Sequence, residues 1–155
     1  MKRLLAIAIV PLLVAGCGSI QVADSAPEPS LAQRWGKALN ECNLDTLVGL
    51  YHSEALFWPT TSPSLATKAA DVRRYYEGAC NWAKTADPRY EILSENVMLY
   101  GDTVVSAGQV KTTFKNPKGD TQTGLIRFTL TGRRMGGTWA IIEHHSSLMP
   151  SPPPR

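Results

Sequence analysis

The second half of the chain consists of strand-like segments separated by turn sequences, and this pattern limits the folds that it can adopt. After Pro88, turns are predicted at Gly101-Asp102, at residues 116–120 (Asn-Pro-Lys-Gly-Asp) and at residues 135–137 (Met-Gly-Gly). The segments between these turns predict four long strands, at residues 90–99, 103–114, 121–134 and 138–148. Consecutive strands joined by short turns pair in antiparallel fashion, so this half predicts a meander.

The first half has a helical period instead. Ser30 can cap a helix that extends to about Glu41, because apolar side chains recur there at a spacing of three to four residues. A second, short helix is predicted to extend through Tyr51. Residues 55–58 predict a short strand, which the following proline ends, and a third helix with one apolar stripe is predicted from Thr67.

Helices followed by a run of antiparallel strands predict an α+β domain, with the helices packed on one face of a curved sheet. We place this domain at residues 30–149. Residues 17–29 contain two prolines and small polar residues and predict a flexible tether. The proline-rich residues 150–155 predict a tail that cannot join a sheet.

The N-terminus has the features of an export signal. A basic pair at residues 2–3 and an apolar run at residues 4–14, too short to span a bilayer, precede two small residues and Cys17. This order resembles the signal of bacterial lipoproteins. The resemblance implies that residues 1–16 are removed and that Cys17 is lipidated. It also implies a membrane anchor in the cell envelope, on the periplasmic side of the outer membrane in a Gram-negative cell. An ordinary signal peptide with a chance cysteine is the alternative.

The charge of the chain does not indicate a nucleic-acid partner. The formal net charge is +3, and it falls to about +1 without the basic pair of the signal. The remaining adjacent basic pairs, Arg73-Arg74 and Arg133-Arg134, do not extend into a basic stripe.

Two cysteines remain once Cys17 is assigned to the lipid. In an oxidising compartment such a pair usually closes, so the sequence predicts a disulfide between Cys42 and Cys80. Two buried thiols are the alternative. A zinc site is disfavoured, because neither cysteine belongs to a CxxC motif or lies near clustered histidines.

The C-terminal segment RFTLTGRRMGGTWAIIEHHSSLMP (residues 127–150) resembles the last two strands of the NTF2-like superfamily, of the SnoaL-like type. The resemblance is closest to the branch related to the calcium/calmodulin-dependent protein kinase II association domain. Trp35, Leu50-Tyr51-His52 and residues 57–61 fit the family's opening, so the likeness covers residues 30–150. It implies a cone in which a strongly curved sheet wraps helices around a pocket. It also implies a homodimer through the outer face of the sheet.

Strand alternation divides the last strand into two faces. His144 and Ser146 share one face, whereas Glu143 and His145 share the other. The resemblance implies that His144 and Ser146 face the pocket and bind ligand there. A one-residue bulge would reverse this assignment.

Arg127 lies in the middle of a predicted strand, where alternation with Leu125 and Thr129 predicts burial. A buried guanidinium needs a partner, so we interpret it as an anion hook at the base of the pocket, for a carboxylate or phosphate. The resemblance also implies arginines in that pocket. A structural salt bridge to Glu95 or Glu143 is the alternative.

Aromatic side chains are the remaining candidates for the pocket wall. Trp58 and Tyr76 are predicted ligand contacts, with Trp35 as a further aromatic candidate, and plain core packing is the alternative for all three.

The motifs of common enzyme classes are missing from this sequence. It has no Ser-His-Asp spacing, phosphate-binding loop or GxGxxG motif, and no cofactor is predicted. His144 and His145 are neighbours that point to opposite faces, so they do not predict a metal site. The predicted function is binding of a small polar or anionic ligand without catalysis. Two alternatives stay open: an isomerase or lyase with His144 as base, and a dimeric interaction module with a vestigial pocket.

Overall fold

The computed structural model describes residues 25–150. The elements follow in the order α1 (Leu31–Asn40), α2 (Leu44–Gly49), β1 (Tyr51–Trp58), α3 (Ala69–Ala86), β2 (Arg89–Tyr100), β3 (Thr103–Lys115), β4 (Thr121–Met135) and β5 (Thr138–Leu148). The predicted signal, Cys17, the first part of the predicted tether and residues 151–155 lie outside the described residues. Within residues 25–150, no helix has the length and apolar character needed to cross a membrane.

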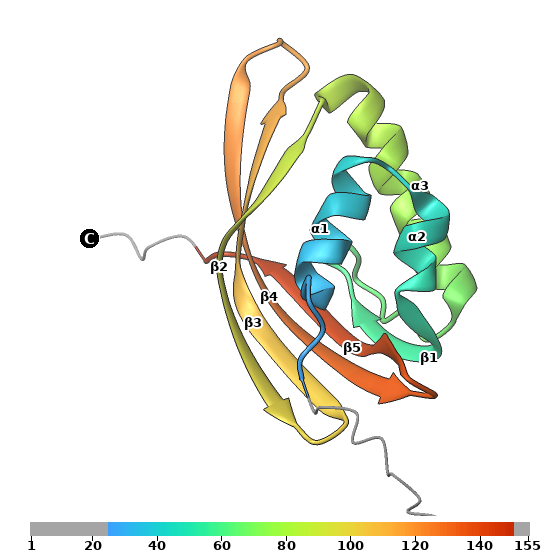
Figure 1. Ribbon diagram of the computed structural model, residues 1–155. Helices are drawn as coiled ribbons and strands as arrows, with labels where there is room; N and C mark the ends of the chain where they lie inside the picture. The colour runs from blue at the N-terminus through green and yellow to red at the C-terminus, as the bar shows by residue number, and fades with distance from the viewer. Residues whose placement is uncertain (1–24, 151–155) are drawn as a thin grey trace, which may run out of the picture.

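One five-stranded sheet curves around the three helices, which all lie on its concave side (Figure 1). The strand order is β1-β5-β4-β3-β2, and every neighbouring pair is antiparallel except β1 with β5. The predicted α+β fold with helices on one face of a curved sheet is confirmed. The four strands of the predicted meander agree with β2 to β5 within one residue at each end.

Helix α1 begins where the sequence predicts, because Ser30 forms a reciprocal cap with Gln33. The Ser30 hydroxyl accepts a hydrogen bond from the Gln33 backbone N–H at 3.1 Å, and the Ser30 N–H donates to the Gln33 side chain at 3.0 Å. The buried face of α1 includes Leu31, Trp35 and Leu39. This face packs into the concavity of the sheet and brings the Trp35 indole towards the centre of the cone.

The predictions for the region between α1 and α3 need correction. The second helix ends at Gly49 rather than at Tyr51, and Tyr51 is already the first residue of β1. The residues after Tyr51 are polar, so apolar alternation does not reveal the first part of this strand. The strand forms by parallel pairing with β5, which comes from the far end of the chain. Helix α3 begins at Ala69, two residues after the predicted Thr67.

The predicted disulfide between Cys42 and Cys80 is confirmed. The two Cα atoms are 5.6 Å apart, and the cysteines are 38 positions apart in the sequence. The bond ties the turn between α1 and α2 to the middle of α3. It therefore links the helices to one another covalently. Strand pairing holds the sheet together but does not do so for the helices.

Candidate functional site

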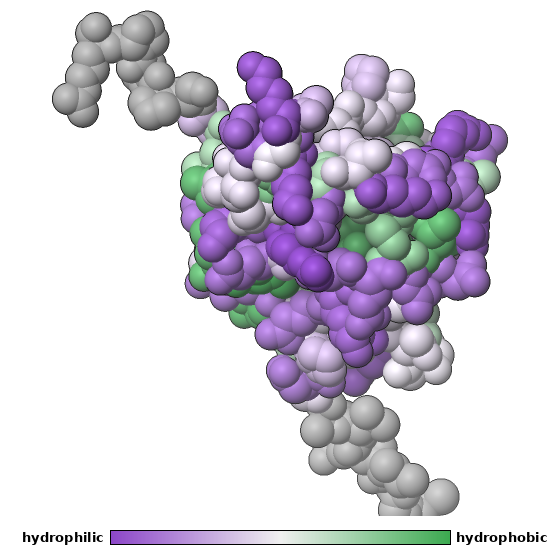
Figure 2. Space-filling model, turned by 90° about the horizontal axis from the view of Figure 1, so that it is seen from above, coloured by the Kyte–Doolittle hydropathy of each residue, from purple (hydrophilic) through white to green (hydrophobic). Residues whose placement is uncertain are grey.

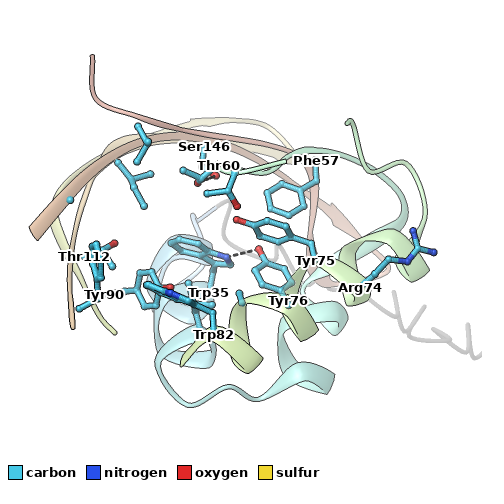
Figure 3. A pocket seen from close by; sticks show the side chains of 18 residues that line it. Trp35, Phe57, Thr60, Arg74, Tyr75, Tyr76, Trp82, Tyr90, Thr112 and Ser146 are labelled. Carbon is cyan, nitrogen blue, oxygen red and sulfur yellow. Dashed lines mark hydrogen bonds between the residues drawn. The ribbon is translucent and has the colours of Figure 1, made fainter. Parts of the chain in front are cut away.

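A cavity of about 620 Å³ lies between the concave face of the sheet and helices α1 and α3. Its walls are mainly aromatic, with rings from Trp35, Phe57, Tyr75, Tyr76, Trp82, Tyr90 and Phe114. Figure 3 shows these side chains gathered from the helices and the sheet around one space. Figure 2 looks down on the end of the molecule that carries the β3–β4 turn, where an apolar area is enclosed by hydrophilic side chains. A volume of this size suits a ligand of drug-like dimensions.

Few polar groups reach the cavity, and most of them are hydroxyls. Thr60 and Ser146 are joined by a hydrogen bond of 2.7 Å between their hydroxyl oxygens. The Thr112 hydroxyl is buried and has no hydrogen-bond partner within the described residues. Among the described residues that line the cavity, Arg74 alone carries a charge; its side chain is largely exposed and pairs with Asp71 at 3.2 Å.

A chain of buried hydrogen bonds runs from the cavity wall into the core. The Trp35 indole N–H donates to the Tyr76 hydroxyl at 2.7 Å (Figure 3), the Tyr76 and Tyr51 hydroxyl oxygens are 2.6 Å apart, and Tyr51 lies 2.7 Å from Nδ1 of His144. An indole can only donate. The order that uses every proton therefore has Tyr76 donating to Tyr51 and Tyr51 donating to Nδ1. This order leaves the imidazole proton of His144 on Nε2, which is buried without a partner among the described residues.

His144 is fully buried behind the cavity wall rather than exposed in it. Its ring stacks on Phe57 with centroids 4.9 Å apart and meets the Trp35 ring edge-on at 5.3 Å. This burial, together with the nearby His145, lowers the pKa of His144 from 6.5 to about 3. The imidazole is therefore neutral at neutral pH. Burial also raises the pKa of the Tyr51 and Tyr76 hydroxyls, so the whole chain of hydrogen bonds is uncharged.

The structure brings three of the five predicted ligand contacts to the inner side of the sheet. Ser146 and Tyr76 line the cavity, while His144 lies behind Phe57 and Trp35 on the same face. A bulge in the pairing of β4 with β5 does occur, between Thr131 and Gly132. It lies before Glu143 in β5, so the alternation of inner and outer side chains from Glu143 onwards is kept.

The predicted position of Arg127 in the pocket is wrong. Arg127 is exposed on the outer face of the sheet, and its Nε donates to the Ser147 hydroxyl at 3.0 Å. It forms neither of the alternative salt bridges. The inner face of β4 carries the alternate residues Ile126, Phe128 and Leu130, so Arg127 takes the opposite side together with Leu125.

Trp58 is also misplaced by the prediction. Its side chain is 47% exposed, whereas its neighbour Phe57 is buried and lines the cavity. Trp58 pairs across the sheet with His145, an outer-face residue, so strand alternation directs it away from the pocket. The outer face also exposes Leu93, Met98 and Leu125. The homodimer through this face stays a prediction.

Sequence reasoning missed Thr112, Tyr90 and Trp82 among the residues that line the cavity. Alternation could have found Thr112, because it shares the inner face of β3 with Val104 and Val110. Nothing in the sequence shows which polar residues of an inner face meet a cavity and which meet a helix.

Comparison with known proteins agrees with this architecture. The family model of the calcium/calmodulin-dependent protein kinase II association domain matches residues 29–150. The chain belongs to this family. A solved association domain of this kind from Xanthomonas campestris is 27% identical, with a TM-score of 0.67 over 81% of this chain and 93% of that one. The chain has no significant match among curated proteins.

Other solved structures share the fold of this family member at lower identity. An NTF2-like protein with a cystatin-like fold from Novosphingobium aromaticivorans is 13% identical, with a TM-score of 0.69 over 79% of this chain and 80% of that one. A ketosteroid isomerase-like protein from Erwinia carotovora atroseptica is 16% identical, with a TM-score of 0.63 over 78% of this chain and 92% of that one. These matches show the NTF2-like fold and do not extend to function.

Proposed function

We propose that the protein binds a small, largely apolar and aromatic ligand in the cavity of its cone, without transforming it. The observation that carries this proposal is the cavity itself, about 620 Å³ walled by seven aromatic rings and by hydroxyls. The expected preference for an anion rested on Arg127, which lies on the other side of the sheet. We therefore expect a neutral, aromatic ligand rather than an anionic one.

The chemistry of the wall supports binding over catalysis. Among the described residues that line the cavity there is no carboxylate, histidine, lysine or cysteine, and burial raises the pKa of the Tyr76 and Tyr90 hydroxyls away from neutrality. General acid–base catalysis needs such a group with a pKa near the working pH. The alternative, an isomerase or lyase with His144 as base, meets two obstacles: Nδ1 is bound to Tyr51, and the pKa of His144 is lowered to about 3.

Gly124 provides a test, because it lines the cavity and nothing lies within 4 Å of the position that its Cβ would take. We expect Gly124→Leu to fold, to occupy part of the cavity, and to weaken binding of 4-phenylphenol at least about tenfold, the factor that 1.4 kcal/mol represents. Isothermal titration calorimetry would measure the affinity. Gly49→Leu is the matched control, since Gly49 also has open space around it but lies outside the cavity. Equal affinities in the wild type and Gly124→Leu would contradict the proposal.

We further propose that the domain is held at the cell envelope by a lipid on Cys17. The order of basic pair, apolar run, small residues and cysteine supports this, and so does the Cys42–Cys80 disulfide, since such bonds persist in oxidising compartments. Mass spectrometry of the protein purified from bacterial membranes should give an N-terminal peptide that begins at a diacylglyceryl-modified Cys17. Cys17→Ser, which has no thiol, should carry no lipid. An unmodified Cys17 in the wild-type protein would contradict the anchor.

A further inference from the structure

The buried hydroxyl of Thr112 has no partner, and this is unusual for a polar group inside a protein. Thr112 is 6% exposed, lies in the wall of the cavity, and its Oγ1 makes no hydrogen bond within the described residues. Buried polar groups are almost always paired, because removing them from water without compensation is unfavourable. Valine has nearly the same shape and would avoid this cost, so the hydroxyl needs another explanation.

Open space in the cavity lies beside Thr112, next to its neighbour in β4. In the sheet, Thr112 lies between Tyr90 of β2 and Gly124 of β4, and both of these residues line the cavity. The space above Gly124 is empty within 4 Å of a Cβ position. A bound molecule could therefore extend over Gly124 to the side of Thr112, and a shift of a neighbouring side chain would bring it within hydrogen-bond distance of Oγ1, which has less than 1 Å² of exposed surface.

The charges around Thr112 decide the nature of this partner. Tyr90, beside it, is neutral at neutral pH, and burial raises its pKa to about 12. Arg74, the charged residue of the cavity lining, lies at the opposite side of the cavity from Thr112 and Tyr90 in Figure 3. A carboxylate or ammonium next to Thr112 would lose its water without gaining a counter-charge.

We propose that Thr112 determines specificity, by hydrogen bonding a neutral phenol or carbonyl group at one end of an aromatic ligand. The body of this ligand lies among the rings of Trp35, Trp82 and Phe114. The inference rests on the proposed binding function and adds the class of ligand: an aromatic molecule with a neutral hydrogen-bonding group at one end.

The test compares three probes that share a biphenyl body in calorimetry: 4-phenylphenol, 4-methylbiphenyl, which closely matches it in shape, and biphenyl-4-carboxylate, which carries a charge. The wild type should bind the phenol about tenfold more tightly than the methyl compound, the ratio that one well-made hydrogen bond gives. Thr112→Val should remove this preference, Thr112→Ser should keep it, and Thr113→Val, on the opposite face of the same strand, should also keep it. Thr112→Val should unfold at the same urea concentration as the wild type or higher, because it removes an unpaired buried hydroxyl.

The outcomes separate this inference from the proposed function. A preference for the phenol that survives in Thr112→Val, or equal wild-type affinities for the phenol and methyl compounds, overturns the role of Thr112 and leaves cavity binding intact. Tightest binding of the carboxylate overturns the neutral ligand class. If none of the three probes binds, the proposed function falls and the inference falls with it.

Discussion

Replacing His144 with alanine should lower the free energy of unfolding by about 3–5 kcal/mol, as expected when a large, fully buried ring is removed from a packed core. The loss has two sources. The ring contacts with Phe57 and Trp35 disappear, and the Tyr51 hydroxyl loses the acceptor at Nδ1. Leaving the buried Tyr51 hydroxyl without a partner costs about 1–3 kcal/mol, and this cost is included in the total given above.

His145 is the matched control, because it is adjacent in sequence and exposed on the outer face. His145→Ala should change the free energy of unfolding by less than about 0.5 kcal/mol, as is usual for surface substitutions. Urea denaturation of both variants measures the difference. Equal losses would contradict the assignment of the two faces of β5.

Burial of His144 also makes the free energy of unfolding depend on pH. The folded protein holds His144 neutral with a pKa of about 3, whereas the unfolded chain takes up a proton near the ordinary value of 6.5. Stability from this group is complete above pH 6.5 and is lost as the pH falls towards 3, with a slope of at most about 1.4 kcal/mol per pH unit. Carboxylates also titrate there, so the wild-type curve is compared with that of His144→Gln. Parallel curves would contradict a neutral, buried His144.

Removal of the disulfide is the second change with a large expected effect. The loop closed by Cys42 and Cys80 spans 38 positions, for which loop-closure entropy predicts a contribution of about 4 kcal/mol to stability. The double variant Cys42→Ala/Cys80→Ala should therefore unfold at clearly lower urea than the oxidised wild type. Because the bond holds the turn between α1 and α2 to α3, the loss should first reach the helical layer and leave the paired strands β3 and β4 protected.

Reductant supplies the control for this prediction. Dithiothreitol should lower the stability of the wild type to about that of the double variant and leave the variant itself unchanged. Hydrogen exchange measured by mass spectrometry would locate the loosened segment. Unchanged stability of the wild type on reduction, with both thiols shown to be free, would contradict a stabilising disulfide.

Much of the fold could be predicted because its signals are local. Turn sequences mark the ends of β2 to β5. The reciprocal cap of Ser30 and Gln33, which are three residues apart, marks the start of α1. The start of β1 could not be predicted, because Tyr51 becomes a strand residue only through pairing with Ile141, 90 positions later in the numbering. Non-local pairing of this kind leaves no local pattern in a polar stretch.

The site was less predictable, because a one-residue shift in strand phase moves a side chain to the other face. His144 and Ser146 were placed on the inner face, whereas Arg127 and Trp58 were given the wrong side of their strands. Both faces of β4 carry apolar residues, so hydrophobicity does not distinguish them. The role suggested for Thr112 needed the third dimension: an empty space beside it and a hydroxyl without a partner.

The central claim is that the cone binds an aromatic molecule on its inner side. A titration of the ¹⁵N-labelled domain with 4-phenylphenol, followed by amide chemical shifts, tests it most directly. We expect shifts that saturate at Thr112, Gly124 and Ser146, which line the cavity, and little change at the outer-face residues Arg127 and His145. Shifts confined to the outer face, or no saturable shifts at all, would contradict the account.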